Sequence, residues 1–582
     1  MNKIAGIIAF FLLSMMFAFM IFSSRGDSAI FDEVAHIPAG YTYVKYQDSR
    51  LNPEHPPLIK DLAALPLLFL HLNFNTNQEF WNIKNVNDRQ WMAGHALLYE
   101  FGNNPDQILF WSRLPIMFLA LVFGWLLFWW IKKRYGNKVA LITLLFYTLS
   151  PTFIAHSRFV TTDLAASFGF FLGFISFLHF LEKRTKKSLL IAGLVFGIVQ
   201  LFKFSLVLLV PIYLILGILW ILTKTASNEI SGPTVLVKLF GQIILIGLIG
   251  LVVIWGVYAF HVWNYPQAQQ LTDAKYILGG YKIQTFAYMD FWLINHRLTR
   301  SLGQYLYGFL MVAQRTAGGN AAYFKGEISS KGWWSYFPTL MLFKEQLAFY
   351  IFGLIALVWA LGKIQKQKFS DWVGNNFPAV ASLIFILFYL AWSLWSPLNI
   401  GVRHALPIFP FLYFLVAVGV VQWLLHGTIP QYLISFLLLL WMALEIFWAF
   451  PFYLSYYNIL GGGVKQGYRI ATDSNYDWGQ DLKRLKEWAE HPPTGVDAQK
   501  IYLDYFGGGS PEYYLREKFQ PWWSARGMPP KGSYLAVSLN SVMGAWARPI
   551  GDMVIKPENS YAWLRNKTPL TRAGSSILIY RF

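Results

Sequence analysis

Long apolar segments dominate this sequence, and each has about the length of roughly 20 residues that a helix needs to cross a bilayer. Only 13% of the 582 residues are charged, about half of the roughly 25% usual in soluble domains. This composition excludes a string of soluble domains and predicts an α-helical polytopic membrane protein. The eleven predicted spans are residues 4–22, 114–131, 139–155, 164–181, 189–202, 204–223, 239–260, 340–362, 377–396, 405–425 and 431–450.

The distribution of Lys and Arg predicts the orientation of these spans. With a cytoplasmic N-terminus, the inside loops 132–138, 182–188, 224–238 and 363–376 hold thirteen Lys and Arg residues, whereas the short outside turns hold three. Cytoplasmic loops are enriched in these residues. We therefore expect a multi-pass protein of the plasma (inner) membrane. The net charge of +18 then needs no nucleic-acid partner.

Two domains follow from this topology. Residues 1–450 form the predicted transmembrane domain, with long outer loops at 23–113 and 261–338. Residues 451–582 are richer in charge, Gly and Pro, and we predict a small extracytoplasmic α/β domain with a helix over 478–490. Its expected strands are 501–506, 534–539 and 576–582. The chain has no Cys, which excludes disulfides, thiolate nucleophiles and Cys-bound zinc.

The first outer loop carries the densest group of ionisable residues. Asp32 and Glu33 follow the first span closely, and the string NPEHPPLIK occupies residues 52–60. The double proline favours a helix start, because Pro at the first helical position loses no hydrogen bond. Carboxylates at the membrane boundary are partly desolvated, which makes them better bases. The alternative is that Asp32 and Glu33 only solvate a loop beside a span.

A divalent metal is another interpretation of this loop. Glu33 and His36 stand one helical turn apart, and Glu54 is next to His55. Such spacings are common by chance, and the chain has no HExxH motif. We therefore expect no required cofactor, with Glu54 kept as the metal-binding alternative.

Cations stand at the outer ends of several spans. Arg158 and Asp163 flank the turn between the third and fourth spans, Lys203 separates the fifth from the sixth, and Arg403 and His404 begin the tenth. Each cation alone could extend to lipid headgroups. Several cations that face one acidic loop at a common depth instead favour binding of an anionic lipid phosphate.

Two further patterns lie in the second outer loop and the tail. The string GWWSYFP at 332–338 is typical of an interfacial aromatic belt, with a sugar-stacking platform as the alternative. Asp473, Asp477 and Asp481 recur every four residues, which does not fit the alternating ligands of a calcium loop. We interpret them as a turn and a helix cap, with Asp477 as the cap.

Together these motifs resemble those of the protein O-mannosyltransferase family and its bacterial relatives, which include the aminoarabinose transferases of lipid A. The resemblance covers most of residues 1–450. It is carried by the Asp32-Glu33 pair, the His55-Pro56-Pro57-Leu58-x-Lys60 string, the turn with Arg158 and Asp163, the Lys203 position and the GWWSYFP string.

The resemblance implies a GT-C fold and a membrane glycosyltransferase, a hexosyl- or pentosyltransferase, that uses a polyprenyl-phosphate sugar donor. An acceptor hydroxyl of a protein Ser/Thr, a lipid or a glycan would attack the anomeric carbon with inversion. Asp32 is the expected general base and Glu33 the orienting group, because adjacent helical side chains diverge by about 100°. The residues expected to bind the donor and its lipid phosphate are His55, Lys60, Arg158, Asp163, Lys203, Arg403 and His404.

Two other classes of function remain open at this point. A secondary transporter would show internal repeats and charged or helix-broken sites near the bilayer midplane; the sequence offers only Glu445, inside the last span. A membrane scaffold that displays the C-terminal domain would leave the motifs of the first loop unexplained. The identities of the sugar, the acceptor and the oligomer do not follow from the sequence.

Overall fold

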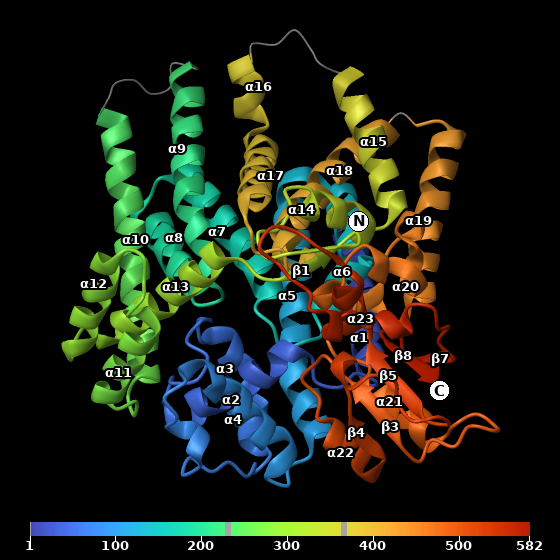
Figure 1. Ribbon diagram of the computed structural model, residues 1–582. Coiled ribbons are helices and arrows are strands. Elements are labelled where there is room, and N and C mark those ends of the chain that lie inside the picture. The colour runs from blue at the N-terminus through green and yellow to red at the C-terminus, as the bar shows by residue number, and fades with distance from the viewer. Residues whose placement is uncertain (1, 227–233, 363–368, 426) are drawn as a thin grey trace.

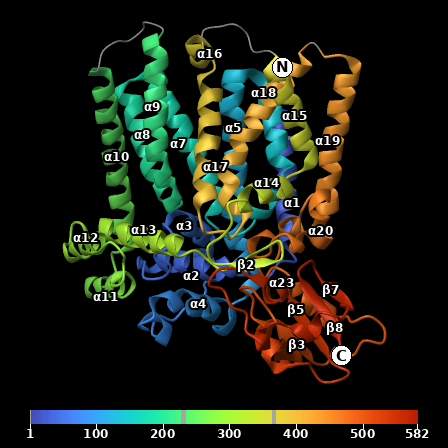
Figure 2. The same ribbon diagram turned by 45° about the horizontal axis from the view of Figure 1, so that its top comes forward.

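The computed structural model describes residues 2–226, 234–362, 369–425 and 427–582, and these form two layers. Long helices make up the upper layer in Figures 1 and 2, and short helices and the strands lie below it. The predicted inside cations Lys363, Lys366 and Lys368 lie outside the described residues.

Among the described residues, eight helices are long and apolar enough to cross a membrane. The number becomes nine if α14 and α15, which are bent by 105° at a short break, are taken as one span. The helices of this layer are α1 (Asn2–Ser24), α5 (Pro105–Thr148), α7 (Asp163–Lys183), α8 (Lys186–Gln200), α9 (Leu209–Ala226), α10 (Thr234–His261), α14 (Tyr336–Lys344), α15 (Leu347–Gly362), α17 (Phe377–Trp395), α18 (Phe409–Leu424) and α19 (Ile429–Ala449). The predicted polytopic helical class is confirmed.

The count of eight or nine is lower than the predicted eleven for two reasons. First, the predicted spans 114–131 and 139–155 share the 44-residue element α5, which reverses at Gly136, where φ is 82°. The Tyr147 hydroxyl donates to the Ala120 carbonyl at 2.9 Å, although one straight helix would hold these residues about 40 Å apart. Second, the predicted span 189–202 falls in α8, which has only 15 residues.

The lower layer begins with the first outer loop. Its helices are α2 (Phe31–Tyr46), α3 (Leu58–Ala64) and α4 (Val86–His95). As the double proline predicted, α3 begins directly after Pro57. The second outer loop adds α11 (Gln267–Leu278), α12 (Gln284–Asn295), α13 (Arg300–Gly318) and the hairpin of β1 (Ala322–Phe324) and β2 (Glu327–Ser329).

The C-terminal region is a mixed α/β structure around a five-stranded sheet of order β4-β3-β5-β8-β7. The three predicted strands are present as β3 (Ile501–Asp504), β5 (Tyr534–Ser538) and β8 (Ile577–Arg581), and the sequence analysis missed β4 (Phe519–Pro521) and β7 (Thr571–Ala573). Helices α21 (Leu482–Glu490), α22 (Pro511–Leu515) and α23 (Leu539–Trp546) accompany the sheet. A short strand, β6 (Arg548–Pro549), pairs with β2 and ties this region to the second outer loop.

The predicted helix over 478–490 begins later, at Leu482, with Asp481 at the N-cap position. Gly479 has a φ of 93°, a left-handed conformation that ends any helix there. The Asp477 carboxylate accepts from the backbone N–H of Asn540 at 2.9 Å instead of capping a helix. The prediction of Asp477 as the cap is therefore wrong.

Candidate functional site

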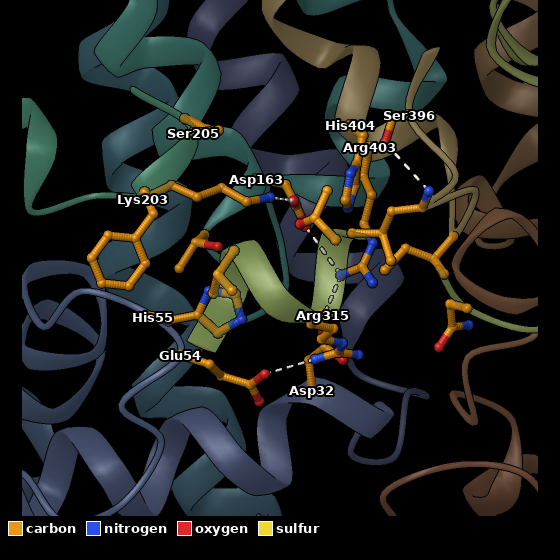
Figure 3. A pocket seen from close by; sticks show the side chains of 18 of the residues that line it. Asp32, Glu54, His55, Asp163, Lys203, Ser205, Arg315, Ser396, Arg403 and His404 are labelled. Atoms are coloured by element: carbon orange, nitrogen blue, oxygen red, sulfur yellow. Dashed lines mark hydrogen bonds and ion pairs between the residues drawn. The ribbon is translucent and has the colours of Figure 1, made fainter. Parts of the chain in front are cut away.

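A cavity of about 740 Å³ lies where the two layers meet. Its lining includes residues of α2, the loop before α3, α7, the short helix η4 (Phe204–Leu208), α13, α17, the turn η5 (Val402–Ile408) and the turn η9 (Asp473–Asn475). Figure 3 shows how the side chains converge from these elements. The ionisable residues of the lining are Asp32, His36, Glu54, His55, Asp163, Lys203, Arg315, Arg403, His404 and Asp473.

Four of these side chains form one chain of ion pairs along the cavity wall. The Nη1 atom of Arg403 lies 2.6 Å from Oδ2 of Asp32 and 3.3 Å from Oδ2 of Asp163. Oδ1 of Asp163 in turn lies 2.5 Å from Nζ of Lys203. The buried Nε of Arg403 has no hydrogen-bond partner among the described residues. Arg403 and Lys203 thus line the same cavity, and Arg403 keeps one donor that no described residue uses. This arrangement suits an anionic ligand.

Helix α2 places two functional groups on one face. Asp32 is in its first turn, and His36 follows one turn later, so both side chains reach the cavity. His36 Nδ1 lies 2.8 Å from the carbonyl oxygen of Val160, and because a carbonyl only accepts, Nδ1 carries the proton. Burial lowers the pKa of His36, which keeps the ring neutral. Its Nε2 is therefore a hydrogen-bond acceptor.

Glu33 does not line the cavity, in contrast to the role expected for it. Its carboxylate is fully buried and lies 2.7 Å from Nη2 of Arg113, and Nε of Arg113 donates to it at 2.8 Å. Two backbone N–H groups, of Ile30 and Val160, also donate to it at 3.1 Å. Glu33 therefore caps its own helix and holds the 158–163 turn, and the divergence of adjacent side chains points only Asp32 into the cavity.

We expect Glu33→Gln to lower the melting temperature sharply, because it leaves the buried Arg113 without its counter-ion. Breaking one partner of a buried ion pair typically costs about 3–5 kcal/mol. The matched control is Glu182→Gln, which removes an exposed pair with Arg134 at 2.9 Å; such pairs contribute about 0–1 kcal/mol. Thermal unfolding of both purified variants measures this difference. Equal shifts in the two variants would contradict the structural role of Glu33.

Lys60 and Arg158 also lie outside the cavity lining. The Lys60 ammonium donates to the Asn52 carbonyl at 2.8 Å and the His55 carbonyl at 2.7 Å, so it holds the loop that carries Glu54 and His55. Burial lowers the pKa of Lys60 to about 7, opposed by Asp61 and Glu54. Arg158 is buried against Asp27, with 2.9 Å between Nη1 and Oδ2. Neither cation borders the cavity, in contrast to the contact with a lipid phosphate that the resemblance implied for both.

The loop before α3 contributes Glu54 and His55. Glu54 Oε2 lies 2.8 Å from Nη1 of Arg315, and the His55 ring packs against His36 with 4.9 Å between ring centroids. Burial, with the neighbouring His36 and Lys60, holds the pKa of His55 well below its usual value. No group of three or more His, Asp or Glu side chains that could hold a metal occurs within the described residues.

The lining residues that were not predicted from the sequence include Arg315, Asp473 and Trp478. Arg315 lies in the last turn of α13, whereas the pattern noted in this outer loop is the aromatic string at 332–338. Asp473 had been interpreted as part of a turn. Trp478 packs on Arg403, with 4.3 Å from the guanidinium carbon to the ring centroid. Of the GWWSYFP string only Phe337 lines the cavity, and Trp334 is 74% exposed.

Residues 97–255 match the family model described as dolichyl-phosphate-mannose-protein mannosyltransferase. The match covers about a quarter of the chain, and it shows that this segment is similar to the family. It confirms the predicted resemblance, and with it the class of enzyme, a glycosyltransferase family that depends on a lipid-phosphate sugar. The matched segment includes Asp163 and Lys203 of the cavity, whereas Asp32 and Arg403 lie outside it.

Several solved structures are similar to this chain at low sequence identity. ArnT from Cupriavidus metallidurans bound to undecaprenyl phosphate is 10% identical, with a TM-score of 0.46 over 98% of this chain and 97% of that chain. The Archaeoglobus fulgidus oligosaccharyltransferase in complex with Zn and sulfate is 12% identical, with a TM-score of 0.44 over 93% of this chain and 69% of that chain. Apo ArnT from Cupriavidus metallidurans gives a TM-score of 0.33 at 10% identity over 98% of this chain and 96% of that chain. No curated protein matches the sequence.

Proposed function

We propose that this protein transfers a sugar from a polyprenyl-phosphate donor to a hydroxyl of a protein, lipid or glycan acceptor, with inversion, on the extracytoplasmic face of the membrane. The observation that carries this proposal is the chain of ion pairs from Asp32 through Arg403 and Asp163 to Lys203. It gives one cavity a carboxylate base and two cations. The matched family is named for a lipid-phosphate sugar, which agrees with this combination.

The cavity suits a lipid phosphate because polar and apolar linings meet in it. Val207, Trp392 and Trp395 line it and are also exposed on the surface of the helix layer, so a polyprenyl chain has an apolar route to the cations. Arg403 and Lys203 would stabilise the negative charge that develops on the departing phosphate. His55 and His404, both in the lining, are the proposed neutral partners of the donor.

In the proposed reaction, the acceptor oxygen attacks the anomeric carbon and transfers its proton to Asp32. The bond between the anomeric carbon and the phosphate oxygen breaks, and the lipid phosphate leaves with the electron pair. Asp32 is held by Arg403 at 2.6 Å. A bound phosphate would compete for that guanidinium and free Asp32 to accept the proton, so donor binding would prepare the base.

The proposed reaction needs no divalent metal, since cations of the protein take the charge of the leaving group. Glu54, the metal-binding alternative, is paired with Arg315, and Asp32 and Asp163 are both paired with Arg403. A metal would have to displace these partners. We expect sugar transfer to continue at its full rate after treatment with EDTA and gel filtration. Loss of transfer that added Mg²⁺ or Mn²⁺ restores would assign Glu54 to a metal.

The direct test is transfer by the purified protein from a panel of radiolabelled polyprenyl-phosphate sugars to membrane extracts. We expect covalent label in a protein, lipid or glycan fraction with one of these donors. A secondary transporter would instead move a solute into proteoliposomes and leave every donor intact. That result, or absence of transfer with all donors, would overturn the proposal.

We further propose the topology that places the cavity outside the cytoplasm. If the α5 hairpin crosses twice and α8 crosses once, the chain has the eleven crossings first expected, and residues 451–582 form an extracytoplasmic domain. In Figure 2, the end of α9 and the start of α10, which flank the inside loop 224–238, lie at the end of the helix layer opposite that domain. The described cations of the inside loops are Lys132, Lys133, Arg134, Lys138, Lys183, Arg184, Lys186, Lys187, Lys224 and Lys238.

Cysteine labelling tests this orientation, because the natural chain contains no Cys. Lys187 is exposed in the first turn of α8, within the inside loop 182–188, and Thr494 is exposed in the C-terminal region. We expect an impermeant maleimide to label Thr494→Cys in spheroplasts or intact cells with a permeable outer envelope, and Lys187→Cys only after lysis. The reverse pattern would invert the proposed topology.

A further inference from the structure

The C-terminal region reaches the cavity through one short segment, residues 472–480. Asp473 and Trp478 of this segment are part of the cavity lining. The segment is anchored to its own domain, because the Thr472 hydroxyl donates to Oδ1 of Asn540 at 2.6 Å. The cavity therefore includes residues of the region 451–582, which the sequence predicted to be a separate domain.

This segment also contacts both elements that carry the proposed catalytic groups. On the side of Arg403, the backbone N–H of Val402 donates to Oδ1 of Asn475 at 2.8 Å, and the Ser474 hydroxyl donates to the Ile400 carbonyl. On the side of Asp32, the first N–H of α2, at Phe31, donates to the Trp478 carbonyl at 3.1 Å. The segment thus fixes the positions of Asp32 and Arg403 relative to each other.

Asp473 has an unusual backbone and an unused acceptor. Its φ is 55°, a left-handed conformation that is costly for residues other than Gly, Asn and Asp and that is frequent at functional sites. Oδ1 accepts from the backbone N–H of Ser474 at 2.5 Å, and Oδ2 makes no hydrogen bond among the described residues. Burial raises the pKa of Asp473 to about 6, opposed by Arg403, so the side chain is mostly ionised at neutral pH.

We infer that Asp473 accepts a hydrogen bond from a hydroxyl of the transferred sugar and thereby selects the donor. This inference rests on the proposed function. A carboxylate repels the phosphate and gains nothing from the lipid, whereas a sugar hydroxyl is a donor that satisfies Oδ2. The sugar is covalently bound to the phosphate, so a phosphate at Arg403 brings the sugar into the same cavity, whose lining includes Asp473 and Trp478. The acceptor hydroxyl belongs at Asp32.

Two substitutions remove the carboxylate without adding backbone strain. Asp473→Gly deletes the carboxylate, and glycine adopts a positive φ freely. Asp473→Asn keeps the shape, and Asn also tolerates this conformation. The matched control is Asp477→Asn, because Asp477 is buried in the same segment and bonds to Asn540 but does not line the cavity.

The measurement is kcat/KM for the donor that the wild-type protein uses and for its set of monodeoxy analogues. With wild-type protein, we expect kcat/KM to be about tenfold to a hundredfold lower for one of the deoxy donors than for the natural donor. This factor is the scale of one hydrogen bond to a charged group. For the natural donor, the kcat/KM of Asp473→Gly should be lower than that of wild type by a similar factor. In this variant, the deoxy analogue should have the same kcat/KM as the natural donor. The kcat/KM of Asp473→Asn for the natural donor should lie between the values of wild type and Asp473→Gly. Asp477→Asn should be less stable than wild type, but it should discriminate between natural and deoxy donors as wild type does.

Full discrimination between natural and deoxy donors in Asp473→Gly would overturn the inference, as would a natural-donor kcat/KM within about twofold of wild type. Either result leaves the proposed function intact, because both require an active wild-type enzyme. Absence of transfer by the wild-type protein with any donor would overturn both proposals together.

Discussion

Asp32→Asn is expected to lower kcat for sugar transfer by about 10²- to 10⁴-fold, the usual contribution of a general base. Asn keeps the shape of the side chain and most of its hydrogen bonding, but it does not accept the proton of the acceptor hydroxyl. The KM for the donor should change little, since the loss falls on the transition state rather than on donor binding. The measurement is initial-rate transfer, normalised to folded, detergent-purified protein.

A structural role for Asp32 predicts a different outcome, because Asp32 also pairs with Arg403. Poor expression or early melting, with near-normal specific activity in the surviving protein, would indicate such a role. The matched control is Asp48→Asn, which removes a buried carboxylate 2.7 Å from Arg50 outside the cavity lining. We expect this control to lower stability and to leave the kcat of folded protein unchanged. Retention of more than about a tenth of wild-type kcat in Asp32→Asn would exclude Asp32 as the base.

The sequence was sufficient for those features that depend on neighbouring residues. Apolar runs predicted the helix layer, and short strand-like runs predicted three strands of the C-terminal sheet. Asp32, Lys203 and Arg403 stand at the outer ends of spans, so their shared depth could be inferred from the span boundaries alone. Their convergence on one cavity agrees with that inference.

The roles of Glu33 and Lys60 could not be predicted, because they depend on distant partners. Glu33 is adjacent to Asp32, yet its partner Arg113 is 80 positions further along the chain. Lys60 binds backbone carbonyls that no motif records. Whether a charged side chain faces a ligand or a buried counter-ion is decided by tertiary packing, and a string such as DE or HPPLxK contains no information on that choice.

The contribution of Asp473 was missed for a related reason. A spacing of four among Asp473, Asp477 and Asp481 suggested one helical face, but the left-handed residues Asp473 and Gly479 break that periodicity. Asp473 is also about 440 positions from Asp32 in a chain of 582 residues. The local pattern therefore described a turn correctly without indicating that the turn borders the site.

The second large effect is expected at Arg403, the cation at the centre of the chain of ion pairs. Arg403→Ala should lower the rate of transfer by about 10²-fold or more, the scale of losing one preorganised donor to a developing negative charge. It also leaves Asp32 and Asp163 without their shared counter-ion, so the cavity becomes less favourable for a phosphate. Arg403→Lys should recover part of the rate, since it returns the charge without the planar fork of donors.

Arg50→Ala is a closely matched control for this prediction. Arg403 is 2.6 Å from Asp32 and 4.3 Å from the ring of Trp478, and Arg50 is 2.7 Å from Asp48 and 4.4 Å from the ring of Trp81. Both arginines are buried, but only Arg403 lines the cavity. Loss of packing alone would therefore affect both variants, whereas loss of phosphate stabilisation affects the kcat of Arg403→Ala only. Wild-type turnover in folded Arg403→Ala would remove Arg403 from the site and leave Lys203 as the cation for the leaving group.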